Sequence, residues 1–111
     1  MRVSDDFVVV ARVADVVPGT AKTVVAGERE IALFNVDGTF YALDNTCPHQ
    51  GGPLAEGWIE NCQVTCPWHA WTFRLSDGSM ILGDYAQVDT FEVRVEADRV
   101  AVRRTPRAGR D

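Results

Sequence analysis

Cysteine and histidine stand close together at two places in this chain of 111 residues. The pattern is Cys47-x-His49, then sixteen residues, then Cys66-x-x-His69. It contains both histidines and two of the three cysteines of the chain. Two loops that each offer one thiolate and one imidazole indicate a single metal site between them. Such ligands favour Zn, Cu or an iron–sulfur cluster over hard cations.

Two kinds of metal centre fit this pattern. In a tetrahedral structural zinc site, two Cys and two His would bind one ion, although zinc sites usually pair like ligands at wider spacing. In a Rieske [2Fe–2S] cluster, two cysteines hold one iron and two histidines hold the other. Each loop must then supply one ligand to each iron, which Cys-x-His and Cys-x-x-His do.

The segments around the two loops have the patterns of β-strands. Asp37-Gly38 lies between two apolar, β-favouring runs and predicts a hairpin. Near the C-terminus, Phe91, Val93 and Val95 alternate with charged residues, as in a half-buried strand. No amphipathic helix is predicted. We therefore expect an all-β sandwich or barrel of about eight to ten strands, with a loop-rich insertion at about 44–75. The predicted strands include 7–13, 22–27, 29–36, 63–66, 70–75 and 90–98.

Length and composition limit what this chain can be. It is short enough for one domain, which we place at 1–104, and we expect a disordered basic tail at 105–111. No apolar run approaches the 18 residues of a membrane span. The N-terminus lacks the bases and the long apolar stretch of a signal peptide, so we expect a cytoplasmic protein. An odd number of cysteines in that compartment argues against disulfides.

The net charge of −5 is unevenly spread. The C-terminal tail holds four arginines, so residues 1–102 keep 7 bases against 15 acids. Such an acidic body would repel nucleic acid. It fits association with a basic partner surface. Glu56 and Glu60 are expected to be solvated acids that could serve as rim charges for such a partner.

The stretches CPHQGGPLAEGWIE and VTCPWHAWTF resemble the Rieske ferredoxin family. IALFNVDGTFYALDNTCPHQGGPL and TFEVRVEADRVAV are also similar to that family, so the resemblance covers about residues 5–104. It implies an all-β Rieske fold with a small cluster-binding sub-domain and a [2Fe–2S] cluster. By position, Cys47 and Cys66 would bind the inner iron, and His49 and His69 the outer iron, with their free ring nitrogens near solvent.

Departures from the respiratory members of the family indicate a low reduction potential. Those proteins carry an extra disulfide-bonded cysteine in each loop, and the matching positions here are Gly52 and Trp68. They also place a Ser and a Tyr after the second histidine, whose hydroxyls hydrogen-bond to cluster sulfurs. Trp71 and Phe73 stand there instead and offer no hydroxyl. We expect a potential on the order of −150 mV.

The third cysteine and the aromatic residues near the second loop also have predicted roles. Cys62 has no histidine partner and is predicted to be a structural or surface thiol. Trp68 is expected near the exposed tip as a docking contact, whereas Trp71 and Phe73 should pack inward.

The sequence thus predicts an electron carrier and not a complete enzyme. It would carry single electrons from an NAD(P)H-dependent flavoprotein reductase to a terminal oxygenase, as a monomer that docks transiently. The alternative client is an NADH-dependent nitrite reductase, whose small subunit has a similar second loop. A zinc-stabilised binding module and a Rieske-fold scaffold without redox function are the rivals from other classes.

Overall fold

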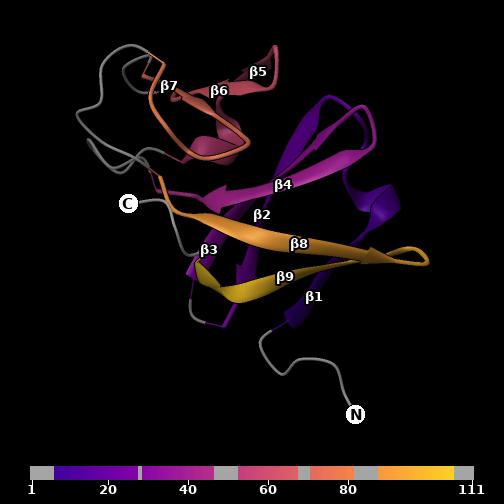
Figure 1. Cartoon of the computed structure of the whole chain (residues 1–111). Helices are drawn as coiled ribbons and strands as arrows, with labels where there is room; N and C mark the ends of the chain where they lie inside the picture. The colour runs from indigo at the N-terminus through magenta and orange to yellow at the C-terminus, as the bar shows by residue number, and fades with distance from the viewer. Residues whose placement is uncertain (1–6, 28, 47–52, 68–70, 82–87, 107–111) are drawn as a thin grey trace.

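The computed structural model describes residues 7–27, 29–46, 53–67, 71–81 and 88–106. These residues form two antiparallel sheets of different size, with two short 3-10 turns and no α-helix in the described ranges (Figure 1). The strands are β1 (Phe7–Arg12), β2 (Thr20–Ala26), β3 (Arg29–Val36), β4 (Thr39–Asp44), β5 (Trp58–Glu60), β6 (Gln63–Thr65), β7 (Thr72–Arg74), β8 (Thr90–Glu96) and β9 (Arg99–Pro106). The 3-10 turns are η1 (Val13–Asp15) and η2 (Leu54–Glu56).

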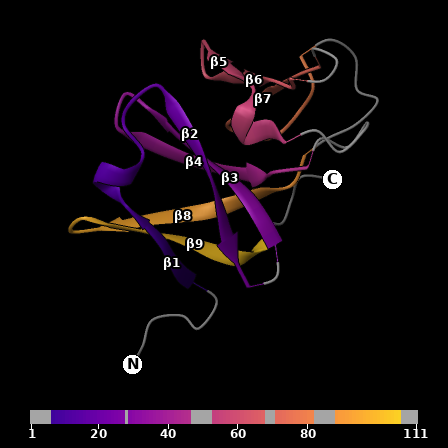
Figure 2. The ribbon, with the colours of Figure 1, turned by 180° about the vertical axis from the view of Figure 1, so that it is seen from behind.

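The larger sheet has six strands in the order β1-β9-β8-β4-β3-β2. Its two edge strands, β1 and β2, approach each other, so the sheet curls into a nearly closed barrel (Figure 2). Hydrophobic side chains fill its interior. They are Ala11, Val16, Val24, Ala26, Ile31, Leu33, Ala42, Phe91, Val100 and Val102. The predicted all-β architecture is therefore confirmed.

Strand β3 is buried on both faces, which explains its uninterrupted apolar run. Ile31 and Leu33 point into the barrel. Ala32 and Phe34, which alternate with them, face the opposite side and join a second core. A strand covered on both faces needs apolar residues at every position and not only at alternate ones. The second core lies between the barrel and the smaller sheet, so the outer face of β3 packs toward that sheet.

The predicted hairpin at Asp37-Gly38 is confirmed as the connection of β3 to β4. Val36 pairs with Thr39, and the two intervening residues have positive φ angles of 53° and 93°. Positive φ at both central positions is the signature of a type I′ turn. The buried Asn35 supports the turn, because its Oδ1 accepts a 2.8 Å hydrogen bond from the Gly38 N–H.

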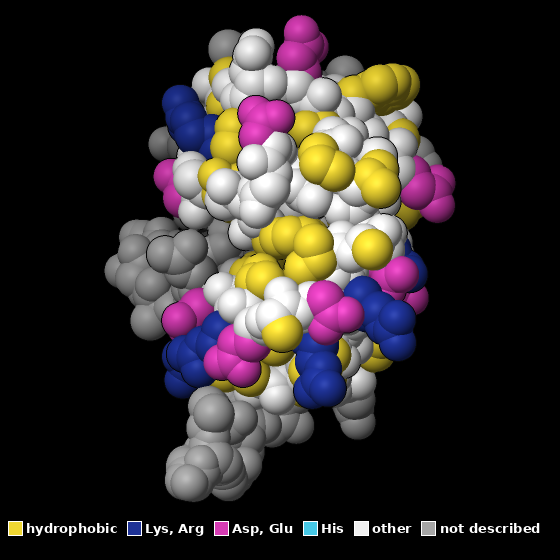
Figure 3. Space-filling view, turned by 90° about the vertical axis from the view of Figure 1, so that its right-hand side faces the viewer, with side chains coloured by type: hydrophobic (Ala, Val, Ile, Leu, Met, Phe, Trp, Pro, Cys, Tyr) yellow, Lys and Arg dark blue, Asp and Glu magenta, His cyan; other side chains and the backbone are white. Residues whose placement is uncertain are grey.

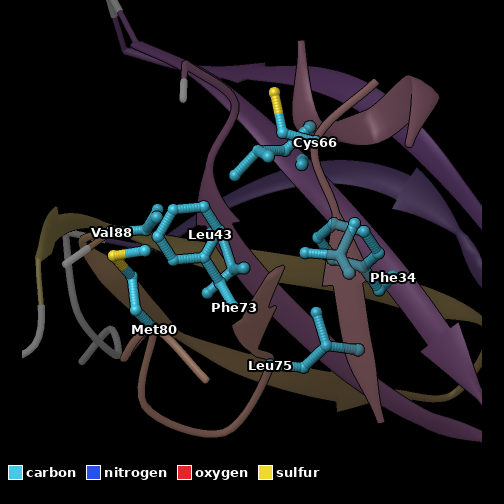
Figure 4. Packing of buried hydrophobic residues seen from close by; sticks show 10 residues of the cluster. Phe34, Leu43, Cys66, Phe73, Leu75, Met80 and Val88 are labelled. Carbon is cyan, nitrogen blue, oxygen red and sulfur yellow. The ribbon is translucent and has the colours of Figure 1, made fainter. Parts of the chain in front are cut away.

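The smaller sheet has three strands in the order β5-β6-β7 and is not hydrogen-bonded into the six-stranded sheet (Figures 1 and 2). Ile59, Val64 and Phe73 are neighbours across its three strands. Val64 and Phe73 are fully buried, and Ile59 packs beside them. This face therefore rests on the second core, which is shown in Figure 4. Strand β5 was not predicted, because three residues are too few to show a period.

The structure corrects two details of the prediction. The alternation of β8 holds for Phe91, which is buried, and for Val93, but Val95 is 46% exposed near the hairpin tip, where the barrel no longer covers it. Strand β9 runs to Pro106, which pairs with Phe91, so it continues past the predicted start of the tail at Thr105. Residues 107–111 lie outside the described ranges. In the described ranges, no helix is long and apolar enough to cross a membrane.

Candidate metal centre

Cys66 follows the last residue of β6 and is completely buried. Its thiol is free of any disulfide. It belongs to the core between the two sheets, together with Leu54, Phe73, Leu75 and other apolar residues. Figure 4 shows its sulfur directed away from Phe73 and Leu75. Cys66 therefore offers a sulfur ligand on an apolar base that shields it from water.

The second predicted ligand loop is closed at its base by hydrogen bonds. The Cys66 N–H donates to the Trp71 carbonyl oxygen at 2.8 Å. One step further down, Thr65 pairs with Thr72, and their hydroxyl oxygens are 3.0 Å apart. The two ends of the segment that contains His69 are thus held side by side by the β6–β7 hairpin, whatever the course of the loop between them.

The first predicted ligand loop is closed in a similar way. Thr46 and Pro53 form an isolated antiparallel bridge on either side of residues 47–52. Directly below the bridge, the carbonyl oxygen of Asn45 accepts a 2.7 Å hydrogen bond from the Leu54 N–H. The side-chain Oδ1 of Asn45 accepts a second bond, of 2.9 Å, from the Ala55 N–H.

Asn45 is therefore the residue that fastens the first loop to the rest of the fold. It is 4% exposed, and its own N–H donates to the carbonyl oxygen of Glu30 on β3 at 3.1 Å. One buried residue thus ties together the barrel and both ends of the loop that carries Cys47 and His49. Sequence reasoning missed this role. The only signal was an asparagine directly before a ligand loop, where Asn commonly supports turns.

The residues that flank a third segment, 82–87, are hydrogen-bonded to the same sub-domain. The Ile81 N–H donates to the Thr72 carbonyl oxygen at 2.9 Å, and the Val88 N–H donates to the Gly78 carbonyl oxygen at the same distance. Gly78 has a φ of +75°, and a Cβ there would lie 2.0 Å from the Val88 carbonyl oxygen. Only glycine therefore permits this close crossing.

The turn before Gly78 is stabilised by Asp77. The backbone N–H and the hydroxyl of Ser79 donate to its Oδ1 at 3.0 and 2.7 Å. These hydrogen bonds stabilise the carboxylate and lower the pKa of Asp77 below its usual range. The predicted turn at Ser76-Asp77-Gly78 thus has a specific role, because its Gly78 carbonyl oxygen holds Val88, the residue that follows the third segment.

The four predicted ligands differ in what the structure shows of them. Cys66 is described, buried and free. Cys47, His49 and His69 lie outside the described residues, as do Gly52 and Trp68. Within the described ranges, which hold one of the four ligands, no group of three metal-binding side chains comes together. The buried thiol and the closed base of each loop fit a [2Fe–2S] cluster bound by two thiolates and two imidazoles.

Cys62, the third cysteine, lies at the opposite end of β6 from Cys66. It occupies the two-residue turn between β5 and β6 with Asn61, and both residues have positive φ angles, of 60° and 55°. Cys62 packs against the core beside Tyr41 of β4. A hydrogen bond to the Cys62 side chain, and then burial, raise the pKa of Tyr41 above its usual value. This contact joins the small sheet to the barrel and agrees with the predicted structural thiol.

Some of the aromatic and acidic residues near the centre are buried in the core and the others are exposed. Phe73 is fully buried and Trp71 packs partly buried against the same core, as predicted. Glu56 and Glu60 are exposed, also as predicted. Trp58, which sequence reasoning passed over, is 64% exposed on β5. Its signal in the sequence was its place in the alternation Trp58-Ile59-Glu60, which puts it on the same face as a charged residue.

Comparison with known proteins agrees with this geometry. The model of the Rieske [2Fe-2S] domain family matches residues 6–103. Apoptosis-inducing factor 3 of Mus musculus is 34% identical over 89% of the chain, but the chain spans only 16% of that protein's length. The ferredoxin component of the naphthalene 1,2-dioxygenase system of Pseudomonas putida is 30% identical over 80% of the chain and 86% of its own length.

Solved structures give the same result. In the complex of reduced oxygenase and oxidized ferredoxin in carbazole 1,9a-dioxygenase, one chain superposes with a TM-score of 0.86 at 27% identity, over 96% of this chain and 100% of that one. Nitrite reductase small subunits superpose with TM-scores of 0.80 and 0.81 at 22% and 23% identity, a likeness that shows the fold alone. This chain belongs to the Rieske [2Fe-2S] domain family, and its cofactor is a Rieske-type [2Fe–2S] cluster.

Proposed function

We propose that this chain is a low-potential Rieske ferredoxin that carries single electrons from an NAD(P)H-dependent flavin reductase to a terminal oxygenase. The observation that carries the proposal is its similarity to ferredoxin components over nearly their whole length. The chain covers 86% of the naphthalene dioxygenase ferredoxin and 84% of the ferredoxin of an alkene monooxygenase system in Xanthobacter autotrophicus. Such components are electron carriers and not catalysts.

We assign the cluster ligands as Cys47 and Cys66 on the inner iron and His49 and His69 on the outer iron. The assignment is supported by the motif spacing and by the buried, disulfide-free thiol of Cys66. When bound, the cluster takes up and releases one electron at a time.

The chain's own residues contribute position and shielding. Leu54, Phe73, Met80 and Val88 form an apolar wall in the core that contains Cys66 and exclude water from its side. The hydrogen bonds below each loop fix the separation of the loop ends, and would thereby hold the ligand-bearing loops in position around the cluster.

We further propose that residues 1–106, through the end of β9, act as one domain, as a monomer that docks transiently to its partners and works in the cytoplasm. Transient docking suits a carrier that must leave one partner before it reaches the next. Size-exclusion chromatography with light scattering tests the monomer, and cell fractionation tests the location.

The test of the proposed function is electron transfer under anaerobic conditions. The reduced chain is mixed in a stopped-flow instrument with the oxygenase components of three systems: naphthalene 1,2-dioxygenase, 3-phenylpropionate/cinnamic acid dioxygenase and the alkene monooxygenase. We expect reoxidation of the chain by at least one of them. If the chain transferred electrons only to the large subunit of an NADH-dependent nitrite reductase, that enzyme, and not an oxygenase, would be its partner. Transfer to none of these acceptors would contradict the electron-carrier function.

A further inference from the structure

The negative charge of this chain is concentrated in the half that carries the ligand loops. Residues 44–89 contain six acids and one base, Arg74, which gives a net charge of −5. The remaining residues contain ten acids and ten bases and are neutral as a group. On the face shown in Figure 3, most Lys and Arg side chains lie in the lower half of the view, whereas Asp and Glu side chains lie in both halves. The ligand-bearing half therefore has a field that attracts basic partners.

The small sheet turns one of its two faces outward. Since side chains alternate along a strand, the residues that alternate with the buried Val64 and Phe73 point away from the core. The strand register places them in two rows across the sheet. We call this surface the Trp58 face. Its first row is Trp58, Thr65 and Thr72, and its second row is Glu60, Gln63 and Arg74.

Trp58 is the large, strongly exposed aromatic side chain of this face. Five large hydrophobic side chains in the described ranges are strongly exposed, and the other four are valines. Single exposed valines are ordinary on protein surfaces. A tryptophan that is 64% exposed is different, because tryptophan is among the residue types most enriched in the few positions that dominate binding at interfaces.

The charges around Trp58 are available for a partner. Glu56 and Glu60 precede and follow it by two residues and are both exposed. Within the part of the chain that the structure describes, no ion pair involves either of them. Arg74, the only base of this half, is engaged by the Ser79 hydroxyl at 3.0 Å. Exposed carboxylates two residues before and two residues after an exposed tryptophan fit a partner surface with an apolar recess and cations at its rim.

The Trp58 face also lies next to the metal centre. Trp58 pairs directly with Thr65, the residue that precedes Cys66. Gly57 brings the two strands very close, since a Cβ there would lie 2.0 Å from the Thr65 carbonyl oxygen. A protein that covers Trp58 would therefore sit one strand away from the predicted inner-iron ligand.

We propose that the Trp58 face docks the oxygenase partner through an apolar recess that receives the Trp58 side chain and is ringed by Lys or Arg. This proposal rests on the proposed function and names the surface through which it acts. Glu56 and Glu60 would raise the rate of encounter, and Trp58 would stabilise the complex once formed.

The experiment uses the stopped-flow reoxidation assay with whichever of the three oxygenase components accepts electrons from the wild-type chain. Trp58→Ala should slow electron transfer at limiting oxygenase at least tenfold, and Trp58→Phe should restore part of the rate. Glu56→Gln with Glu60→Gln should flatten the dependence of the rate on salt between about 0.05 and 0.5 M, because screening acts on exposed charges.

Two matched controls lie on the barrel. Val9→Ala truncates a side chain that is 58% exposed, and Glu30→Gln with Glu96→Gln makes the same change in net charge at two exposed positions of the barrel. Both controls should leave the rate unchanged, and every variant should keep the wild-type EPR spectrum and iron content. Wild-type rates in the Trp58 variants, or equal losses in the barrel controls, would overturn the docking surface and leave the carrier function intact. A wild-type chain that no oxygenase oxidises would instead contradict the proposed function itself.

Discussion

The backbone N–H of Cys66 donates a 2.8 Å hydrogen bond to the carbonyl oxygen of Trp71. This bond closes the second ligand loop at its base, directly beside the thiol that is predicted to bind iron. The thiol itself is fully buried, so its position depends on the packing below it and not on contact with solvent. The Thr65–Thr72 pair and the core residue Phe73 continue the same support downward.

Cys66→Ser should abolish the cluster while Cys62→Ser should retain it. Cys66 presents its sulfur from the apolar core beside the loops, whereas Cys62 lies in the β5–β6 turn. We expect iron to fall from about two per chain to near zero in the first variant, with loss of the visible colour, and to stay at about two in the second. Iron assay and absorption spectra check this. Equal iron in both variants would contradict the assignment of Cys66.

Asn45→Ala should loosen the first ligand loop. The substitution leaves the Ala55 N–H without its 2.9 Å acceptor and should cost about 1–3 kcal/mol of unfolding free energy. Iron retention should fall and the EPR g-values should shift, because Cys47 and His49 follow Asn45 in the chain. Asn45→Asp keeps an oxygen acceptor and should restore both.

Asn35 provides the matched control for Asn45. It is also buried, its Nδ2 donates to the Val16 carbonyl oxygen at 2.7 Å, and its Oδ1 supports the hairpin between β3 and β4. Asn35→Ala should lower stability by a similar amount but leave the EPR spectrum of the folded protein unchanged. If both alanine variants gave the wild-type spectrum, Asn45 would be a structural residue without influence on the centre.

Gly57→Ala should destabilise the small sheet. The new Cβ would lie 2.0 Å from the Thr65 carbonyl oxygen and 3.0 Å from its carbon, so β5 must move away from β6. Such overpacking costs about 1–3 kcal/mol, which thermal unfolding would detect as a lower Tm. Thr23→Ala is the control, because it changes an exposed side chain of β2 on the barrel. A Gly57→Ala variant as stable as the control would refute the close crossing.

Tyr41 should titrate above its usual pKa of about 10 in the folded protein. The hydrogen bond to Cys62 and partial burial favour the neutral phenol, so the folded pKa is raised. The unfolded chain therefore loses this proton first as the pH rises, and the stability from the Tyr41–Cys62 contact is present below about pH 10 and lost above it. Tyrosinate absorbance in a Tyr85→Phe background measures the midpoint. Cys62→Ala should lower it, and an unchanged midpoint would show that the contact does not hold Tyr41.

Much of the barrel could be predicted because its signals are local. Asp37-Gly38 fixes the β3–β4 hairpin through positive φ angles, and the apolar run from Ile31 to Phe34 marks a strand covered on both faces. The spacing of cysteines and histidines left a zinc site and a Rieske cluster open, the resemblance to Rieske ferredoxins implied the cluster, and the family match confirms it. These features depend on residues that are close together in the sequence, so the sequence pattern predicts them.

The support of the metal centre could not be predicted, because it depends on contacts between distant segments. The hydrogen bonds of Asn45 reach Glu30 and Ala55, and the exposure of Trp58 depends on which face of β5 meets the core. Strands of three residues carry too few positions to reveal a period. The exposure of Val95 could not be predicted for a similar reason, because it depends on where the barrel ends and not on the neighbouring residues in the sequence.

The most direct test of the central claim is an EPR spectrum of the purified protein before and after reduction with dithionite, with iron and zinc measured on the same sample. We predict a silent oxidised protein that gains a rhombic [2Fe–2S] signal on reduction, with about two irons per chain and a potential on the order of −150 mV. A colourless, silent protein with one zinc and no iron, even after anaerobic reconstitution, would contradict the electron-transfer account and support a zinc-stabilised binding module.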